Sequence, residues 1–549
     1  MKLIDCEGPF SYCDLTTSNW VSVMSRYCLL LLFIIVIPHD VYSENKPLDY
    51  IISNGTIIDG TGSEGYQASI GIRGDTIVAI GDLTTVKARH RIDATGYVVS
   101  PGFIDLHSHS DRDLIKHPDA TNNITQGVTT MLGGNCGGSP VDIAEFLDIL
   151  DETNISVNMA MLIGHNSVRR EVMQRENRDA SESEMAQMKS LIDEAMRAGA
   201  FGMSSGLIYI PGAFSPPEET QQLARVVHRH DGFYATHMRS EGKKVVDAVA
   251  EALEVAKTTG IHVHISHHKA AGPDAWGLSV KTLALIDKSI SDGLEITLDQ
   301  YPYTASNTNL GVLMPSWSLA GGQKAFVERL DDPEVREKIK QEVIAILKSQ
   351  RAGNELWRIQ ISRYQKNPAL QGLNFEQVLR ERGLEPTLDN GAELAIELQS
   401  NGGGRGIYHT MRDDDVERIM RHPLTSIASD GRGVSWQLGN PQPRNYGTSP
   451  RTLAKYVRDE KVLTLSEAVK KMTSMPATVM GLADRGVLKK GYKADIAIWN
   501  PDTVQDNSTY TDPHNYSTGM KYVIVNGIPV LSGGEMTNNR PGIALRYND

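Results

Sequence analysis

The stretch Val98–His109 reads VVSPGFIDLHSH, a short apolar run that ends in two histidines. Apolar runs of this length between turn residues are typical of buried strands. Similar runs follow along the chain, and helix-periodic segments such as 181–198 and 241–259 separate most of them. The candidate strands span residues 98–107, 128–132, 157–164, 200–205, 232–237, 262–267, 294–301 and 424–430. This repeated alternation of strand and helix predicts an α/β chain that forms a (β/α)8 TIM-like barrel.

The two ends of the chain have a different, strand-rich pattern. Short apolar segments within 50–80 and 494–531 alternate with turns that contain Gly and Asp. We expect residues 46–97 and 485–549 to pair into one small β-sandwich domain. Residues 98–484 then remain for the barrel.

Residues 307–405 are too many for a βα loop, and they have helical periodicity of their own. They predict an inserted subdomain between strands seven and eight of the barrel. A glycine-rich stretch, Asn401–Gly404, lies near its end.

The composition of the chain excludes one class of partner. Its 549 residues have a net charge of -12, with 40% hydrophobic and 22% charged residues. These fractions are ordinary for a soluble globular protein. A nucleic-acid binder needs a basic face for the phosphates, so we expect no nucleic-acid partner.

The segment Tyr27–Pro38 is apolar throughout but spans only 12 residues. Because a membrane-spanning helix needs about 20 residues, this segment predicts a signal peptide within residues 1–43, or an N-terminal anchor if it is uncleaved. Translation would begin at Met1 or at Met24. We expect the body of the protein in the secretory pathway, secreted or lumenal (the lysosome included), with membrane contact only through a retained anchor. Sequons that suit a glycoprotein begin at Asn54, Asn123, Asn154, Asn507 and Asn515.

Cys136 is the one cysteine that follows the apolar segment. With no second cysteine, the body of the protein has no internal disulfide. A lone thiol is either a small buried core residue or a metal ligand.

Polar residues that bind metals stand at the ends of the expected strands. Reactive residues of a barrel lie at the carboxyl ends of its strands. His107 and His109 are two residues apart, so they point to the same side of an extended backbone. Four other such residues follow strands two, five, six and eight: Cys136, His237, His267 and Asp430. A thiolate and two imidazoles suit Zn²⁺ with an open coordination position, beside which a carboxylate can transfer protons.

These segments resemble a known family, the D-aminoacylases (N-acyl-D-amino-acid deacylases) of the amidohydrolase superfamily. The likeness covers nearly the whole chain after about Lys46. It is carried by the motifs Pro101–His109, Gly202–Leu207, His237–Arg239, Ser266–Lys269, Pro443–Thr448 and Lys490–Asp495. The resemblance implies a hydrolase that converts small N-acylated D-amino acids to a carboxylate and a free D-amino acid. It also implies that the insertion forms a flap over the pocket.

The resemblance also implies roles for the residues at the strand ends. Asp430 resembles the catalytic acid/base. His107 and His109 resemble the ligands of a weaker second metal site, which Asp430 also touches. The ligands of the tightly held Zn²⁺ are then Cys136, His237 and His267.

The free α-carboxylate of such a substrate requires cations and hydroxyl groups. Arg444 is the leading candidate, because a guanidinium can bind a carboxylate with two hydrogen bonds. Lys269 stands two residues after a ligand, so we expect it on the same side of the chain. Tyr301 and Ser306 are expected to donate hydrogen bonds, with Tyr303 as the alternative to Tyr301.

Other polar residues near the strand ends are not assigned to the metal site. His268 adjoins a ligand and points in another direction, so it is left out of the metal site. His262 and His264 precede it on the strand and are expected to fill the barrel. His165 and Asn166 follow strand three and are pocket residues without an assigned role.

Two other functions compete with this prediction. A cyclic-amide hydrolase of the dihydropyrimidinase or hydantoinase type would share the barrel. Such relatives typically bridge two metals with a carboxylated lysine, whereas strand four reads Met203-Ser204-Ser205 and Cys136 is present. A non-catalytic binding protein on the same barrel is the other alternative, but every expected metal and proton-transfer residue is present.

Overall fold

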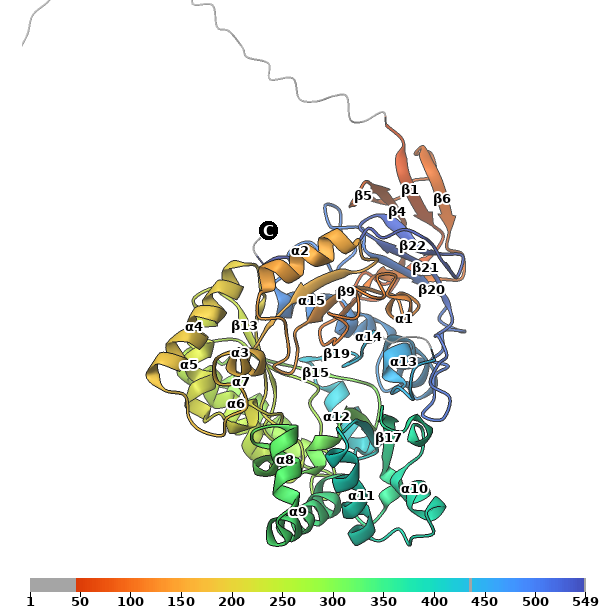
Figure 1. Ribbon diagram of the computed structural model, residues 1–549. Helices are drawn as coiled ribbons and strands as arrows, with labels where there is room; N and C mark the ends of the chain where they lie inside the picture. Colours follow the sequence, from red (N-terminus) through yellow and green to blue (C-terminus); the bar gives the residue numbers. More distant parts are fainter. Residues whose placement is uncertain (1–45, 434–436, 548–549) are drawn as a thin grey trace, which may run out of the picture. The chain divides into compact units, whose positions relative to one another are not determined.

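Eight strand positions form a closed parallel barrel in the computed structural model, which describes residues 46–433 and 437–547 (Figure 1). Neighbouring strands pair in parallel, and a bridge between Ser108 and Gly431 joins the last strand to the first. The predicted fold class, a TIM-like barrel with a small β-domain and an insertion, is confirmed. The strands are β8 (Phe103–Asp105), β9 (Val128–Gly133), β10 (Asn158–Met161) continued by β11 (Ile163–Gly164), β12 (Gly202–Gly206), β13 (Phe233–His237), β14 (Val263–Ile265), β15 (Ile296–Gln300) and β19 (Thr425–Ile427).

Helices connect the strands and cover the outside of the barrel. Helix α4 shows why these helices form. Ser181 and Glu184 make a capping box at its start. Along its length, Met188, Ile192, Ala195 and Met196 recur at helical spacing on the buried face. The helices of this layer are α2 (Ile143–Thr153), α3 (His165–Met173), α4 (Glu182–Arg197), α5 (Pro217–His228), α6 (Val245–Thr259), α7 (Ser279–Ser291), α12 (Asp413–Arg421) and α14 (Leu465–Met472). Shorter helices are α1 (Thr121–Ile124), α13 (Arg444–Arg451) and α15 (Ser474–Met480).

The expected first barrel strand, 98–107, is two strands that belong to different sheets. β7 (Val98–Pro101) pairs with β2 (Thr56–Ile57) and β20 (Ile496–Trp499) outside the barrel. The two strands part at Gly102, where a Cβ atom would lie 2.2 Å from the side chain of Thr129. Only glycine permits this approach. The barrel therefore begins at Phe103, which corrects the predicted boundary at Val98.

Two segments from opposite ends of the described chain, 48–101 and 496–536, lie side by side in a β-domain (Figure 1). One sheet has the order β5-β4-β1-β6, and the other has the order β23-β22-β21-β20-β7-β2-β3. Isoleucines from both chain ends share one core. The last described residues leave this domain, since Ala544 bridges to Met159 of the barrel. The remaining strands are β1 (Leu48–Ser53), β3 (Tyr66–Gln67), β4 (Ser69–Arg73), β5 (Thr76–Gly81), β6 (Ala88–Asp93), β21 (Met520–Val525), β22 (Ile528–Ser532) and β23 (Glu535–Met536).

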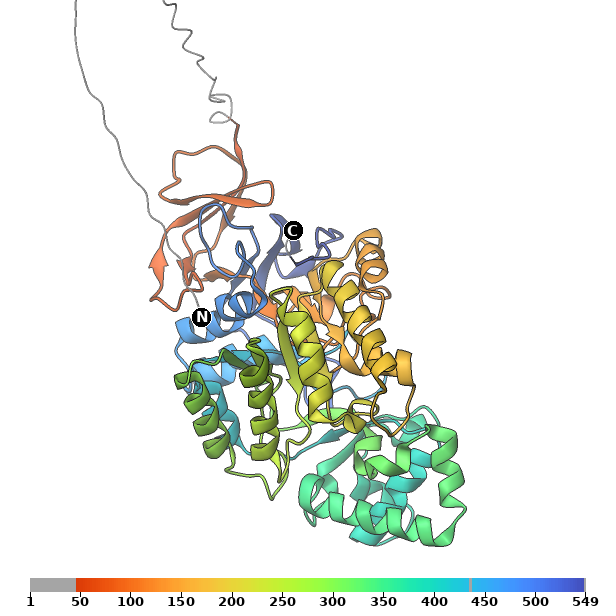
Figure 2. The same cartoon turned by 90° about the vertical axis from the view of Figure 1, so that its left-hand side faces the viewer.

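The insertion between β15 and β19 has a hydrophobic core of its own, which includes Leu313, Phe326, Val343 and Leu394. Figure 2 shows it, in green and teal, as a separate group of helices beside the barrel. Its strands β16 (Ser306–Asn309), β18 (Arg405–Tyr408) and β17 (Ile359–Arg363) form an antiparallel sheet. Its helices are α8 (Gln323–Leu330), α9 (Pro333–Ile346), α10 (Phe375–Glu381) and α11 (Leu388–Ser400).

The predicted signal peptide or anchor, residues 1–43, lies outside the described residues. Within 46–433 and 437–547, no helix is both long enough and apolar enough to cross a membrane. The sequon asparagines differ in exposure: Asn54, Asn154 and Asn507 are exposed, Asn515 is half-buried and Asn123 is buried.

Candidate metal centre

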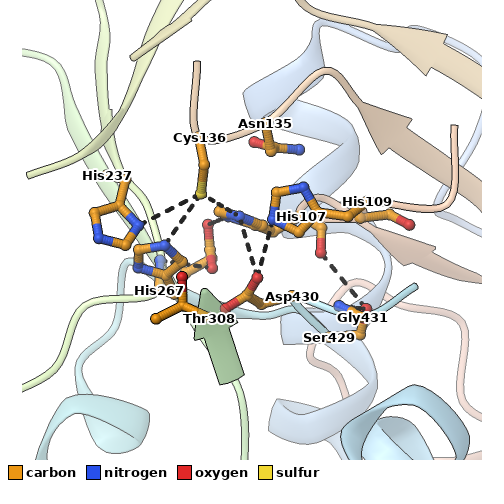
Figure 3. Close-up of polar contacts among 12 residues, drawn as sticks. His107, His109, Asn135, Cys136, His237, His267, Thr308, Ser429, Asp430 and Gly431 are labelled. Carbon is orange, nitrogen blue, oxygen red and sulfur yellow. Dashed lines mark hydrogen bonds and ion pairs between the residues drawn. The ribbon is translucent and has the colours of Figure 1, made fainter. Parts of the chain in front are cut away.

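The ends of five barrel strands place metal-binding side chains at one point (Figure 3). Since the barrel strands are parallel, their carboxyl ends meet at the same face. The residues brought together are His107 after β8, Cys136 after β9, His237 at the end of β13, His267 after β14 and Asp430 after β19. Figure 3 shows the cysteine and the carboxylate on opposite sides of the histidine rings.

Three of these residues have left-handed backbone conformations. The φ angle is 53° at Cys136, 37° at His267 and 47° at Asp430. Residues other than glycine rarely adopt such angles, and strained backbone of this kind concentrates at functional sites. Each strand therefore turns sharply where it ends, and the turn directs the side chain toward the barrel axis.

Cys136 lies at the centre of the candidate zinc ligands. Its Sγ is 3.5 Å from Nδ1 of His237 and 3.3 Å from Nε2 of His267. Tetrahedral zinc, with bonds of about 2.3 Å to sulfur and about 2.0 Å to nitrogen, places two such ligand atoms about 3.5 Å apart. Each of these two distances fits a zinc ion held between the thiolate and an imidazole. The group of three around Cys136 whose ligand atoms all lie within 4.8 Å of one another is His107, Cys136 and His267.

The electrostatic surroundings of Cys136 favour the form that binds metal. Burial opposes ionisation of the thiol, but His107 and His267 outweigh it and hold the pKa of Cys136 well below its usual value. These surroundings therefore favour the thiolate, which is the metal-binding form of cysteine.

A second group of potential ligands, His107, His109 and Asp430, adjoins the first through the contact between His107 and Cys136. Nε2 of His107 is 3.3 Å from the Cys136 sulfur and 3.8 Å from Oδ1 of Asp430. The same carboxylate oxygen is 3.1 Å from Nε2 of His109. Burial opposes ionisation of Asp430, but Arg444 and His109 outweigh it and hold its pKa well below the usual value. The ionised carboxylate can therefore accept a proton or touch a second metal.

Asp299, which the sequence did not single out, orients two of the histidines. Its Oδ2 contacts Nδ1 of His107 at 3.2 Å and Nε2 of His264 at 2.7 Å. Its Oδ1 accepts a hydrogen bond from the backbone of His267 at 2.9 Å. A carboxylate behind a ligand histidine fixes the tautomer and the ring orientation. His264 therefore takes part in the polar network as well as filling the barrel.

Glu241 lies behind two other candidate ligands, His237 and His267, and it was not predicted from the sequence either. Its Oε1 contacts Nδ1 of His267 at 3.0 Å, and its Oε2 lies 3.8 Å from Nε2 of His237. Lys269 forms a buried ion pair with Glu241, and its Nζ is 2.8 Å from Nδ1 of His267. Lys269 thus lies on the ligand side of the chain, as expected, but its partner in this structure is a protein carboxylate. Charged neighbours of this kind give no local sequence signal.

The candidate carboxylate-binding residues gather around Tyr301. The guanidinium of Arg444 lies 4.5 Å from the centroid of its ring, and Lys269 lies 5.4 Å away. Nη2 of Arg444 pairs with Asp430, while its buried Nε and Nη1 have no partner among the described residues. The Tyr301 hydroxyl is likewise buried without a described partner. Ser306 begins β16, in the same part of the fold as Arg444.

Tyr303, the alternative to Tyr301, lies apart from this group. Arg451 covers its ring at 4.7 Å. His165 makes a buried hydrogen bond with Glu219. Asn166 donates hydrogen bonds to the carbonyls of Gly206 and Tyr209 and accepts one from the Gly206 amide, so it supports the loop after β12.

Tyr209, which that loop carries, was not predicted as a site residue. Its ring lies 4.7 Å from the ring of His237, and its hydroxyl accepts a hydrogen bond from Thr308 of the insertion. It borders two cavities, a larger one of about 800 Å³ and a smaller one of about 380 Å³. Tyr209 therefore links the metal centre to the insertion.

Two of the remaining histidines lie outside the metal centre. His268 bonds to Thr282, which agrees with its exclusion from the ligands. His262 bonds to Thr297 inside the barrel wall.

Comparison with known proteins gives consistent matches along the chain. The model of the amidohydrolase family matches residues 91–531. The D-aminoacylase of Alcaligenes xylosoxydans xylosoxydans is 36% identical over 526 residues, which cover 92% of this chain and 98% of that relative.

Solved structures agree with these matches. N-acyl-D-glutamate deacylase from Bordetella bronchiseptica, complexed with zinc and a phosphonate mimic of the tetrahedral intermediate, has a TM-score of 0.78 and 33% identity. A D-aminoacylase structure concerned with a binuclear metal centre has a TM-score of 0.77 and 36% identity. Each covers 91% of this chain and 100% of the other.

Proposed function

The chain belongs to the amidohydrolase family, and on that premise we propose that it hydrolyses the amide bond of N-acyl-D-amino acids to a carboxylate and a free D-amino acid. One observation carries the proposal. The sulfur of Cys136 contacts the rings of His107, His237 and His267, and His107 in turn lies 3.8 Å from the carboxylate of Asp430.

We infer that Cys136, His237 and His267 hold one zinc ion tightly. His107, His109 and Asp430 form a weaker second site, because they offer one carboxylate and no thiolate. When bound, zinc supplies Lewis acidity that polarises the amide carbonyl and acidifies water.

The residues of the chain then move the protons. Asp430 accepts a proton from the attacking water and donates it to the leaving nitrogen. His109 and Arg444 hold its two oxygens at 3.1 and 2.9 Å, which orients the carboxylate. Asp299 and Glu241 keep the ligand histidines in place.

The selection for D-amino acids follows from fixing three substituents of the substrate at once. The free donors of Arg444, together with the Tyr301 hydroxyl, bind the α-carboxylate. The scissile amide lies at the metal centre, and the side chain enters a cavity bordered by Tyr209. With those three directions set, only one configuration at Cα places the amide correctly.

The strand-four sequence speaks against the cyclic-amide alternative. β12 (Gly202–Gly206) has Ser204 and Ser205 at its centre and no lysine that could bridge two metals. Ser204 instead donates a hydrogen bond to the backbone carbonyl of Gly134, so it holds the turn before Cys136.

The test measures release of free amino acid from paired N-acetyl-D- and N-acetyl-L-amino acids, with and without a zinc chelator. We expect release from the D-series only, loss of release on chelation, and recovery when zinc is added back. No release from either series by protein that retains zinc would refute this function.

We also propose that the protein enters the secretory pathway. The apolar segment Tyr27–Pro38 and the exposed sequons at Asn54, Asn154 and Asn507 support this. Expression in eukaryotic cells should give protein whose mobility changes on treatment with a glycosidase specific for N-linked glycans. An unchanged mobility together with retention in the cytosol would contradict it.

A further inference from the structure

The larger of the two cavities at the metal centre, of about 800 Å³, is lined by residues of both the barrel and the insertion. Among them are Tyr209 and Glu241, and the carboxylate of Glu241 lies 3.8 Å from Nε2 of His237. The smaller cavity is lined by His109 and Asp430. Figure 3 shows His237 and His109 at opposite ends of the group of rings, so the two cavities flank the metal centre on different sides.

The two sides of the metal centre can take the two halves of the substrate. Arg444, the candidate partner of the α-carboxylate, pairs with Asp430, which lines the smaller cavity. The amino-acid half therefore lies on that side, and the acyl group extends from the scissile amide toward the larger cavity. Pockets of about 300–1,000 Å³ hold drug-sized ligands, so a cavity of about 800 Å³ is much larger than an acetyl group requires.

Arg351 lines the larger cavity as a buried cation without a partner. It ends the π-helical turn Leu347–Arg351, which follows α9, and it is 6% exposed. Its guanidinium lies 5.2 Å from the centroid of the Tyr408 ring, but within 46–433 and 437–547 it forms no hydrogen bond or ion pair. Burying a guanidinium without a hydrogen bond is costly, since water no longer solvates it. A ligand that brings an acceptor atom to Arg351 would remove this cost.

The barrel holds the turn that carries Arg351 close to the metal centre. A Cβ atom at Gly272 would lie 2.5 Å from the carbonyl oxygen of Gln350, and one at Gly242 would lie 3.6 Å from Cγ of Gln350. Gly242 is the neighbour of Glu241 in the chain. The loops after β13 and β14 therefore pack directly against this turn of the insertion.

A free acceptor lines the same cavity. Nε2 of Gln399, on α11, donates a hydrogen bond to Oε1 of Gln323 at 3.2 Å, while Oε1 of Gln399 has no hydrogen-bond partner among the described residues. Each peptide group offers one acceptor, which suits Arg351, and one donor, which suits Gln399. An alkyl chain offers neither, and it would bury Arg351 further without a partner.

We propose that the acyl group of the substrate is itself a short peptide, so that the protein removes the last residue of peptides that end in a D-amino acid. This inference rests on the proposed function and names its acyl group. The bond that breaks joins the carbonyl carbon of the penultimate residue to the nitrogen of the D-residue. Water supplies a hydroxyl group to that carbon and a proton to that nitrogen, which yields a shortened peptide and a free D-amino acid. Arg351 binds a carbonyl oxygen of the peptide, and Gln399 accepts a hydrogen bond from one of its N–H groups.

The test compares kcat/KM within two pairs of acyl groups of equal chain length, each carried by D-leucine and by D-glutamate. One pair is acetylglycyl and pentanoyl, and the other is acetylglycylglycyl and octanoyl. The N-acetyl derivatives of the same two amino acids report on the proposed function. Because a hydrogen bond to a charged group favours the peptide, we expect the peptidyl member of at least one pair to be preferred by about 10- to 100-fold.

Two variants locate the effect. Arg351→Met keeps a long side chain but no donor, so it should lower the ratio of peptidyl to alkyl kcat/KM by about 10-fold or more. Gln399→Met should lower it by about three- to tenfold, and it gives a second reading if Arg351→Met fails to fold. Arg358→Met is the matched control. Arg358 also lies over an aromatic ring, 4.7 Å from the centroid of Trp357, but it does not line the cavity, so the ratio should equal that of the wild type.

The outcomes separate this inference from the proposed function. Hydrolysis of an N-acetyl-D-amino acid, with the alkyl member equal to or better than the peptidyl member in both pairs, would overturn the inference and leave the proposed function standing. A peptidyl preference that is unchanged in every folded variant at Arg351 and Gln399 would overturn it as well. No hydrolysis of any of these substrates by zinc-loaded protein would overturn both.

Discussion

Arg444 and Asp430 form an ion pair at the end of the barrel, with Nη2 and Oδ2 2.9 Å apart. The pair joins the candidate carboxylate-binding residue to the candidate proton-transfer residue. It follows that changes at Arg444 act on the ionisation of Asp430 as well as on substrate binding.

Asp430→Asn should remove the proton-transfer group while leaving the tight zinc site intact. We expect kcat to fall by about 10²–10⁴-fold, the usual contribution of a positioned acid/base. Zinc content should stay that of the wild type, because Cys136, His237 and His267 are unchanged. Steady-state kinetics and metal analysis on the same sample check both parts. Activity close to that of the wild type would refute the role of Asp430.

Arg444→Ala should raise KM by about 10- to 100-fold, since a charged hydrogen-bond donor to the α-carboxylate is lost. It should also move the acidic limb of the pH profile of kcat/KM to higher pH. The reason is that Arg444 holds the pKa of Asp430 down, so its removal lets that pKa rise.

Arg451→Ala is the matched control for this change. Arg451 also lies over a buried tyrosine and pairs with a carboxylate, but it does so away from the metal centre. Both variants should lose thermal stability, and only Arg444→Ala should shift the pH profile. An unchanged KM in Arg444→Ala would mean that the carboxylate is bound elsewhere.

Asp299→Asn should weaken zinc binding at the second site, which His107 forms with His109 and Asp430, by about 10- to 100-fold, as is usual when the carboxylate behind a ligand histidine is altered. The change removes the charge that orients His107 and His264. Competition with a chelator of known affinity measures the effect. Asp287→Asn is the control, because Asp287 pairs with His422 outside the metal centre and should not affect zinc affinity. Equal zinc affinity in the two variants would contradict the role of Asp299.

His262 should make the fold less stable in mild acid. Burial, and then repulsion from His264, lowers the pKa of His262 to about 4 in the folded state. Between pH 6.5 and 4 the unfolded state therefore binds more protons than the folded one. The free energy of unfolding then falls as the pH drops through this range, by at most about 3 kcal/mol.

His262→Gln should remove this contribution, because glutamine does not titrate. Urea unfolding at pH 7 and pH 4.5 checks the difference between the two proteins. If the wild type and the variant lose the same stability over this range, then His262 does not carry the effect.

The fold class could be predicted from the sequence because strands and helices have different periods. Strand candidates such as 128–132 and 157–164, with helical segments between most of the candidates, predict a barrel before any contact is known. The boundary at Gly102 could not be predicted in this way. The segment 98–107 is continuous in sequence, and only the approach of Thr129 shows why the chain leaves one sheet and enters another.

The candidate ligands could be predicted for a similar reason. His107, Cys136, His237, His267 and Asp430 all stand at strand ends, and parallel strands in a barrel end at one face. Their partners depend on which strands are neighbours. Asp299 lies on β15, next to β14, and reaches across the barrel to His107 of the first strand. No local pattern distinguishes it from an ordinary strand residue.

By itself, the sequence determined the α/β barrel, the insertion and the set of candidate metal-binding residues, because each depends on spacing along the chain. Only the tertiary structure decided which charges are paired. Glu241 pairs with Lys269, and Asp430 pairs with Arg444. Arg405 bonds to Asn307 and has no carboxylate partner among the described residues. The physical reason is that charges interact through space over a few ångströms, and those distances exist only after barrel closure and the insertion bring distant segments together.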